Sequence, residues 1–204
     1  MVLNRITRCV SLMLWIALSA IMAHAQTSNL LQNPNADEGA NYWRTDGNAT
    51  VEQTDDANWR FTVRNKGYFL QDVTLPDGSV GKYALLIGRV SSERINADGA
   101  ITGLPYLYGY MMERASLTGE RIKSYLQGQQ MLYWAKNTNE WVTVWGVFEV
   151  PPGTGTIRFF LKQAERKDVP QNGSAAWFDD LGLYLFPTEE EAKTFAQMYK
   201  EQKH

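Results

Sequence analysis

The residues best suited to bind a ligand in this sequence are aromatic, and three of them alternate along one stretch. Tyr106, Tyr108 and Tyr110 are separated by Leu107 and Gly109, so an extended backbone would place the three phenol rings on one face. A ring offers a flat apolar surface, and arginine and glutamine offer planar hydrogen-bonding groups, so together they can orient a polar ligand. The candidate ligand-binding residues are Tyr106, Tyr108, Tyr110, Trp134, Trp141, Trp145, Arg89 and Gln127.

Packing inside the protein is the competing interpretation for these aromatic residues. Tyrosine and tryptophan are ordinary strand residues because their large side chains fit a pleated, half-buried surface. Trp141 or Trp145 could instead receive Phe195 and Tyr199 of a C-terminal helix. Both interpretations stay open at the level of the sequence.

A second chemical feature is a set of carboxylates near the two ends of the chain. Asp179 and Asp180 lie in the last apolar stretch, and Glu38 follows the first turn-rich stretch. Calcium takes six to eight oxygen ligands, which neighbouring first and last strands could supply from carboxylates and backbone carbonyls. The sequence therefore predicts a structural calcium ion at Glu38, Asp179 and Asp180. The alternative is that the aspartates cap turns or accept backbone N–H groups without a metal.

The scarcity of cysteine and histidine excludes several kinds of chemistry. The chain has one cysteine and two histidines. Cys9 and His24 lie in the first 25 residues, and His204 is the final residue. After removal of the first 25 residues there can be no disulfide, no Cys/His zinc site and no cysteine nucleophile. A Ser-His-Asp triad is excluded as well, because a terminal histidine is a poor general base.

Residues 1–25 have the pattern of a secretory signal. Arg5 and Arg8 precede an apolar run over residues 10–22, and Ala23-His24-Ala25 fits a small-x-small cleavage site. The run is too short to predict a membrane span, although an uncleaved anchor is the alternative. We therefore expect a secreted or periplasmic protein with no membrane partner after cleavage.

The charge balance argues against nucleic acid as a partner. The 204-residue chain has 20 basic and 22 acidic residues, for a net charge of −2, and neither sign is concentrated in one stretch. Binding to a nucleic-acid backbone requires a cluster of Lys and Arg.

Short apolar stretches separated by turn residues predict an all-β protein. About ten such stretches occur over residues 26–187, which favours one β-sandwich domain. In the closing stretch, alternation predicts Trp177, Asp179, Leu181, Leu183 and Leu185 on one face. Residues 188–204 are expected to form an amphipathic helix and tail, because Thr188 and Glu191 have the spacing of a capping box.

Two motifs carry a family resemblance. The first is Asn29-Leu30-Leu31-Gln32-Asn33-Pro34, and the second is Phe178-Asp179-Asp180-Leu181, preceded by Val150-Pro151. Together they resemble the galactose-binding-like jelly rolls, which include carbohydrate-binding modules of families 4, 9 and 22, and the opening motif is similar to that of F-box-associated domains. The resemblance implies a jelly-roll β-sandwich, a carbohydrate partner and, in many such modules, a bound calcium ion.

The resemblance and the residues together lead to one main hypothesis and two alternatives. We expect an exported β-sandwich that binds a glycan without turning it over. A module that docks a protein partner is the alternative from another class. A glycoside hydrolase would need two carboxylates about 5 to 9.5 Å apart, and no pair stands out among Glu52, Glu93, Glu113, Glu120 and Glu140.

Overall fold

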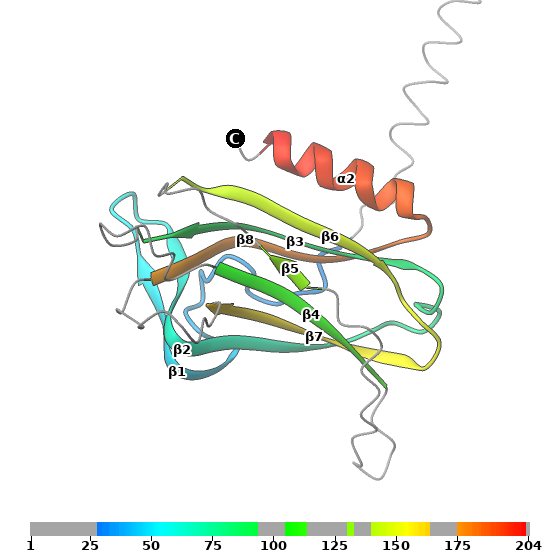
Figure 1. The fold of residues 1–204 in the computed structure, drawn as a ribbon, viewed down its shortest axis with the longest axis horizontal. Helices are drawn as coiled ribbons and strands as arrows, with labels where there is room; N and C mark the ends of the chain where they lie inside the picture. Colours follow the sequence, from blue (N-terminus) through cyan, green and yellow to red (C-terminus); the bar gives the residue numbers. More distant parts are fainter. Residues whose placement is uncertain (1–27, 94–104, 114–129, 133–139, 164–174, 203–204) are drawn as a thin grey trace, which may run out of the picture.

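The computed structural model describes residues 28–93, 105–113, 130–132, 140–163 and 175–202 (Figure 1). The predicted signal segment, Gln127 and Trp134 lie outside these residues. The described part contains eight strands and one helix. They are β1 (Arg44–Gln53), β2 (Trp59–Thr74), β3 (Tyr83–Ser92), β4 (Pro105–Glu113), β5 (Gln130–Leu132), β6 (Val142–Glu149), β7 (Thr154–Gln163), β8 (Ala175–Phe186) and α2 (Glu189–Gln202).

The strands form one antiparallel sheet that curls into two layers (Figure 1). Its strand order is β5-β4-β7-β2-β8-β3-β6, and β1 pairs with β2 outside this order. Residues 68–74 of β2 pair with β7, whereas residues 61–64 pair with β8. The first layer therefore consists of β5, β4, β7 and the end of β2, and the second layer consists of the start of β2, β8, β3 and β6. The expected jelly-roll β-sandwich with a C-terminal helix is confirmed.

The bend that carries β2 from one layer to the other depends on two residues that suit its backbone geometry, Asn65 and Gly67. Asn65 has φ of 52°, and the pairing of β1 with β2 shifts register between Asp46 and Asn48. A Cβ atom at Gly67 would lie 2.5 Å from the backbone carbon of Asn48. Only glycine allows this close approach of two backbones at a bulge.

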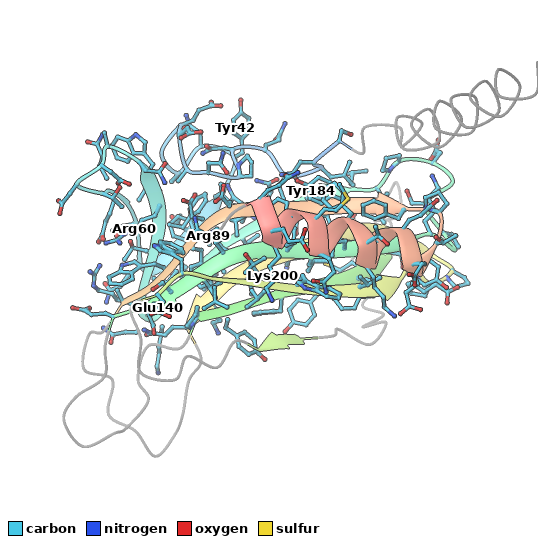
Figure 2. The ribbon with its side chains drawn as sticks, turned by 90° about the horizontal axis from the view of Figure 1, so that it is seen from above. Tyr42, Arg60, Arg89, Glu140, Tyr184 and Lys200 are labelled. Atoms are coloured by element: carbon cyan, nitrogen blue, oxygen red, sulfur yellow. The ribbon has the colours of Figure 1, made fainter. Side chains whose placement is uncertain are left out.

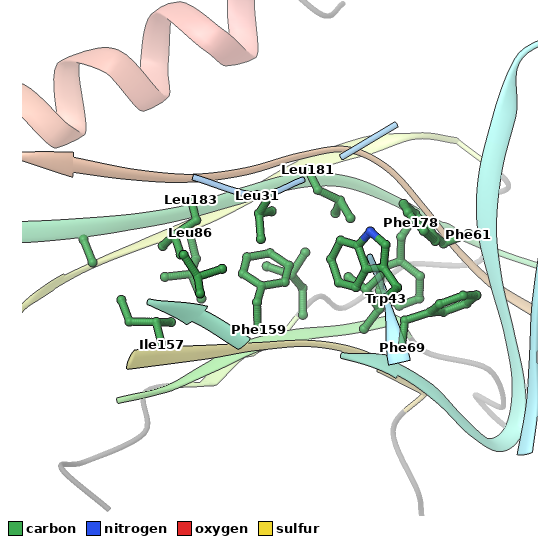
Figure 3. Packing of buried hydrophobic residues seen from close by; sticks show 14 of the residues in the cluster. Leu31, Trp43, Phe61, Phe69, Leu86, Ile157, Phe159, Phe178, Leu181 and Leu183 are labelled. Carbon is green, nitrogen blue, oxygen red and sulfur yellow. The ribbon is translucent and has the colours of Figure 1, made fainter. Parts of the chain in front are cut away.

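Large apolar side chains fill the space between the two layers (Figure 3). The ring of Phe61 lies 5.0 Å from that of Trp43 and 5.0 Å from that of Phe69, and Trp43 also contacts Phe159 at 6.1 Å. The indole Nε1 of Trp43 donates a hydrogen bond to the carbonyl of Asn33 at 3.1 Å. Burial of these rings removes a large apolar area from water and supplies much of the driving force for folding.

Residues 29–34 of the opening segment pair with the edge of β8 beyond residue 178, where the pairing with β2 ends. The amide of Leu30 donates to the carbonyl of Leu183 at 2.8 Å, and the amide of Leu181 donates to the carbonyl of Pro34 at 3.2 Å. The Asn29 side chain donates to Leu181 O at 2.9 Å, and its Oδ1 accepts from Leu183 N at 3.0 Å. The two motifs that carry the family resemblance are thus hydrogen-bonded to each other.

A bulge in β8 corrects one prediction from the sequence. Asp180 has φ of 48°, and the pairing of β3 with β8 shifts register between Ile87 and Arg89. Phe178 belongs to the core before the bulge, and Leu181 and Leu183 belong to it afterwards. Because the extra residue reverses the alternation, the prediction that Trp177 and Asp179 share a face with Leu181 and Leu183 is wrong.

Helix α2 covers the outer face of the second layer (Figure 1). Its Ala192 and Ala196 pack on Leu85, Ile87, Tyr184 and Phe186, and Phe195 lies 4.7 Å from the Tyr184 ring. The helix begins as expected, since the Thr188 hydroxyl accepts a hydrogen bond from the Glu191 amide at 3.2 Å. Trp145 is partly buried in this same cluster, so the structure favours the packing alternative for it.

Replacement of Trp145 tests this assignment. We expect Trp145→Ala to lower the free energy of unfolding by about 2 kcal/mol, because it removes a large ring from the contact between α2 and the sheet. Denaturant unfolding would measure the change. Met198→Ala, at an exposed position on α2, is the control and should change stability by less than about 0.5 kcal/mol. Equal stability of the Trp145 variant and the wild type would contradict the assignment.

Replacement of Asn29 tests the closure of the β8 edge. Asn29→Ala removes three hydrogen bonds, which Asn29 makes with Leu31, Leu181 and Leu183. We expect a loss of about 2 to 3 kcal/mol in the free energy of unfolding, because the partly buried backbone groups lose their partners. Asn41→Ala, at an exposed position in the same segment, should leave urea unfolding nearly unchanged. If both variants unfold alike, Asn29 does not hold this edge.

Candidate ligand-binding face

The outer face of the first layer carries a group of aromatic side chains, which we call the aromatic strip. It consists of Tyr106, Tyr108 and Tyr110 of β4, Phe160 of β7 and Tyr68 of β2. The alternate residues of β4, Leu107 and Met111, lie in the core. The predicted alternation along β4 is therefore confirmed.

The rings of the strip contact one another. Tyr108 stacks on Phe160 with ring centroids 4.8 Å apart and an interplanar angle of 9°. Tyr106 and Tyr110 meet Tyr108 edge to face at 5.0 and 5.1 Å, and Tyr68 lies 5.7 Å from Phe160. Tyr108 is only 6% exposed, whereas the other four rings are partly exposed. The strip is thus a continuous, packed surface whose outer members can meet a ligand.

The phenol of Tyr106 remains neutral at physiological pH. Burial raises the pKa of Tyr106, and the nearby Tyr110 raises it further. A neutral phenol can both donate and accept a hydrogen bond. The strip therefore combines apolar ring surface with polar groups.

Charged side chains border the strip on the same face. Arg158 lies on this face because the residues of β7 alternate between the core and the surface. Its Nε and Nη2 donate to the two carboxylate oxygens of Asp72 at 2.6 and 2.8 Å. Arg44 of β1 also donates to Asp72. Lys162 lies opposite Tyr106 on one side and Tyr68 on the other. Sequence reasoning missed Tyr68, Phe160 and these charged residues, because it could not show that β4, β7 and β2 are neighbours.

Arg89 and Trp141 lie on the other side of the molecule from the strip. Arg89 is on the outer face of the second layer, as its neighbour Val90 belongs to the core. Its guanidinium lies 5.4 Å from the Trp141 ring, and Nη1 lies 3.5 Å from Asp180 Oδ2. Figure 2 shows Arg89 beside α2. The predicted ligand-binding residues are therefore divided between opposite faces.

The predicted metal residues do not meet as a ligand set. Asp179 is buried, and its Oδ2 accepts from Asn58 Nδ2 at 2.9 Å, while Oδ1 accepts from the Asp180 amide at 2.8 Å. Glu38 is exposed. Nowhere in the described ranges do three His, Cys, Asp or Glu side chains gather so that they could hold a metal ion. These residues alone do not fit calcium, which stays a prediction from the sequence.

Comparison with known proteins identifies the fold. No family model matches the sequence, and no curated protein matches it. Among solved structures, a cyclase from Fischerella sp. TAU has a TM-score of 0.53 at 13% identity, over 80% of this chain and 100% of that one. The enzymatically active domain of tailspike protein 4 of bacteriophage CBA120 has a TM-score of 0.52 at 14% identity, over 78% of this chain. The chain spans 21% of that tailspike protein.

A third structure is built from carbohydrate-binding modules. The tandem of two family 22 modules from Xyn10C of Paenibacillus barcinonensis has a TM-score of 0.50 at 15% identity, over 81% of this chain and 48% of that one. The chain therefore shares the jelly-roll β-sandwich fold of these modules, and this is the fold that the two motifs predict. Within the described residues, no helix is long and apolar enough to cross a membrane.

The buried carboxylate of Asp179 predicts a dependence of stability on pH. Burial raises the pKa of Asp179 to about 6, and the charge of Asp180 adds to this effect, against hydrogen bonds and Arg89. A raised pKa means that the folded state binds the proton more tightly than the unfolded state does. The stabilisation is complete below the unfolded-state pKa and is lost as the pH rises through about 6.

The isosteric variant Asp179→Asn isolates this contribution. The wild type should lose up to about 2 kcal/mol of unfolding free energy from this group between about pH 4 and pH 7, and the variant should not lose it. Urea unfolding over this range measures both profiles. Asp37→Asn, at an exposed position, should keep the wild-type profile. Parallel profiles for wild type and Asp179→Asn would show that Asp179 does not titrate in this range.

Proposed function

We propose that this protein binds a glycan along the aromatic strip and releases it unchanged. The observation that carries the proposal is the gathering of five aromatic rings on one outer face, with charged and hydroxyl groups at their edges. Three strands that are distant in sequence supply these rings. The rings are not part of the core cluster between the layers.

The chemistry of the strip suits a sugar. A pyranose has apolar C–H faces that stack on aromatic rings and hydroxyl groups that need planar or hydroxyl partners. The partly exposed rings of Tyr106 and Tyr110 supply both, and the Arg158–Asp72 pair supplies a planar polar group beside them. Extended strands hold these groups on a rigid surface, which lowers the entropic cost of binding.

The neighbouring folds support carbohydrate binding without deciding it. One neighbour is a tandem of carbohydrate-binding modules, but the other two are named as a cyclase and as an enzymatically active domain. The same fold can host unrelated functions, so the function depends on the residues of the site. Two described carboxylates lie at the strip: both oxygens of Asp72 accept hydrogen bonds from arginine, and Asp46, opposite Tyr68, accepts a hydrogen bond from the Gly47 amide. This engagement supports binding rather than acid–base catalysis.

Export forms part of the proposal. The pattern of residues 1–25 supports a secreted or periplasmic location. A protein without cysteine after this segment does not depend on the redox state of its compartment. Such a protein would meet polysaccharides outside the cytoplasm.

Replacement of the outer rings tests the proposal. A glycan array would first identify a ligand, and titration calorimetry would then measure its affinity. We expect the double variant Tyr106→Ala/Tyr110→Ala to bind at least tenfold more weakly, because the ligand loses the stacking surface of both rings. The variant should also be less stable than the wild type, because both rings pack against Tyr108, so thermal unfolding is used to choose a temperature at which it is fully folded.

Tyr42 provides the matched control for this experiment. It is 56% exposed in the opening segment and is not part of the strip. Tyr42→Ala should bind as the wild type does. If no saccharide binds and the protein co-purifies with a fixed partner protein, the alternative of a protein-interaction module replaces the proposal.

A further inference from the structure

Three positively charged side chains lie along the edges of the aromatic strip, and we call them the cationic rim. They are Arg44 of β1, Arg158 of β7 and Lys162 of β7. Asp72 is the acidic side chain that pairs with two of them. Asp46 of β1 lies opposite Tyr68, so the described charges at the strip are three positive and two negative, in a chain whose net charge is −2.

Strand geometry spaces the cations of β7 along the strip. Arg158, Phe160 and Lys162 alternate with the core residues Phe159 and Leu161, so they share the outer face. Four residues of a strand span about 13 to 14 Å. The Cα atoms of Arg158 and Lys162 are therefore separated by about that distance, with the Phe160 ring between them. A polymer with repeated acid groups can meet both positions at once.

The tyrosines follow the same spacing on the next strand. Lys162 lies opposite Tyr106, Phe160 lies opposite Tyr108, and Arg158 lies opposite Tyr110. Each of the two cations of β7 thus has a ring beside it, and β4 and β7 together present alternating rings and charges. A sugar that stacks on Tyr106 would hold its substituents near Lys162, and one on Tyr110 would hold them near Arg158.

The side chains of the cationic rim can meet acid groups in different ways. Arg158 is 17% exposed, and Asp72 holds its guanidinium in a fixed orientation. Arg44 is 55% exposed, and it contacts the same carboxylate. A fixed guanidinium recognises a planar carboxylate or a sulfate by geometry, whereas the ammonium group of Lys162 offers a compact point charge.

From this arrangement we infer that the aromatic strip selects an acidic polysaccharide, whose repeated carboxylate or sulfate groups meet the cationic rim while its sugar rings stack on the tyrosines. The inference rests on the proposed function and names the class of glycan. Its charge attraction adds to the stacking on the rings. A neutral glycan would use the rings alone.

Matched polymers test the charge directly. Polygalacturonate and its fully methylated ester share one backbone, and only the first carries carboxylates. Dextran sulfate and dextran form the corresponding pair for sulfate. At about 0.05 M salt we expect one acidic polymer to bind at least fivefold more tightly than its neutral counterpart, and this advantage should shrink as salt screens the charges.

A pair of lysine variants locates the charge effect. Lys162→Gln should weaken binding of the acidic polymer about fivefold and leave binding of the neutral one unchanged. Lys200→Gln removes the same charge from α2, on the opposite side of the sandwich (Figures 1 and 2), and should change neither affinity. Thermal unfolding of both variants would verify that they fold.

The outcomes separate the inference from the proposed function. Equal affinity for acidic and neutral polymers, with binding still abolished by the tyrosine replacements, would overturn the inference and leave glycan binding standing. Equal weakening by Lys162→Gln and Lys200→Gln would show general charge attraction and would also overturn it. If none of the four polymers nor any array glycan bound, the proposed function itself would fail.

Discussion

The hydrogen-bonding edge of β8 is the constraint on which this structure depends. β3 pairs with one edge of β8 along its length, but β2 pairs with the other edge only over residues 175–178. Beyond this point the backbone groups of Leu181 and Leu183 would lack a strand partner. Backbone groups left unpaired in a protein interior cost free energy. Asn29, Leu30 and Pro34 remove this cost by bonding to them.

The same closure positions the core. Once the opening segment lies along β8, Asn33 bonds to the carbonyls of Gly39 and Asn41 and so orders the loop that leads to Trp43. The indole of Trp43 then bonds back to Asn33 and packs between the layers. The polar motif at the start of the domain and the apolar core are therefore parts of one arrangement.

The two outer faces of the sandwich have different roles. On the second layer, α2 covers an apolar face, and Tyr199 donates to the carbonyl of Asp180 at 2.6 Å next to the bulge. On the first layer, the rings of the strip and the cationic rim take the corresponding place. The helix thus covers the surface that Trp145 was expected to offer to a ligand, whereas the tyrosines of β4 lie on the opposite outer face.

Local patterns were sufficient for much of this protein, whereas long-range pairing was needed for the rest. Alternation along β4 predicts that Tyr106, Tyr108 and Tyr110 share a face, because the period of a strand is a local property. The motifs at the two ends predict the jelly roll and their own proximity. The bulge at Asp180 was not predictable, since a register shift depends on the partner strand. The place of Phe160 in the strip and of Arg158 and Lys162 beside it was not predictable for the same reason, because the order β4-β7-β2 brings together residues that are far apart in the chain.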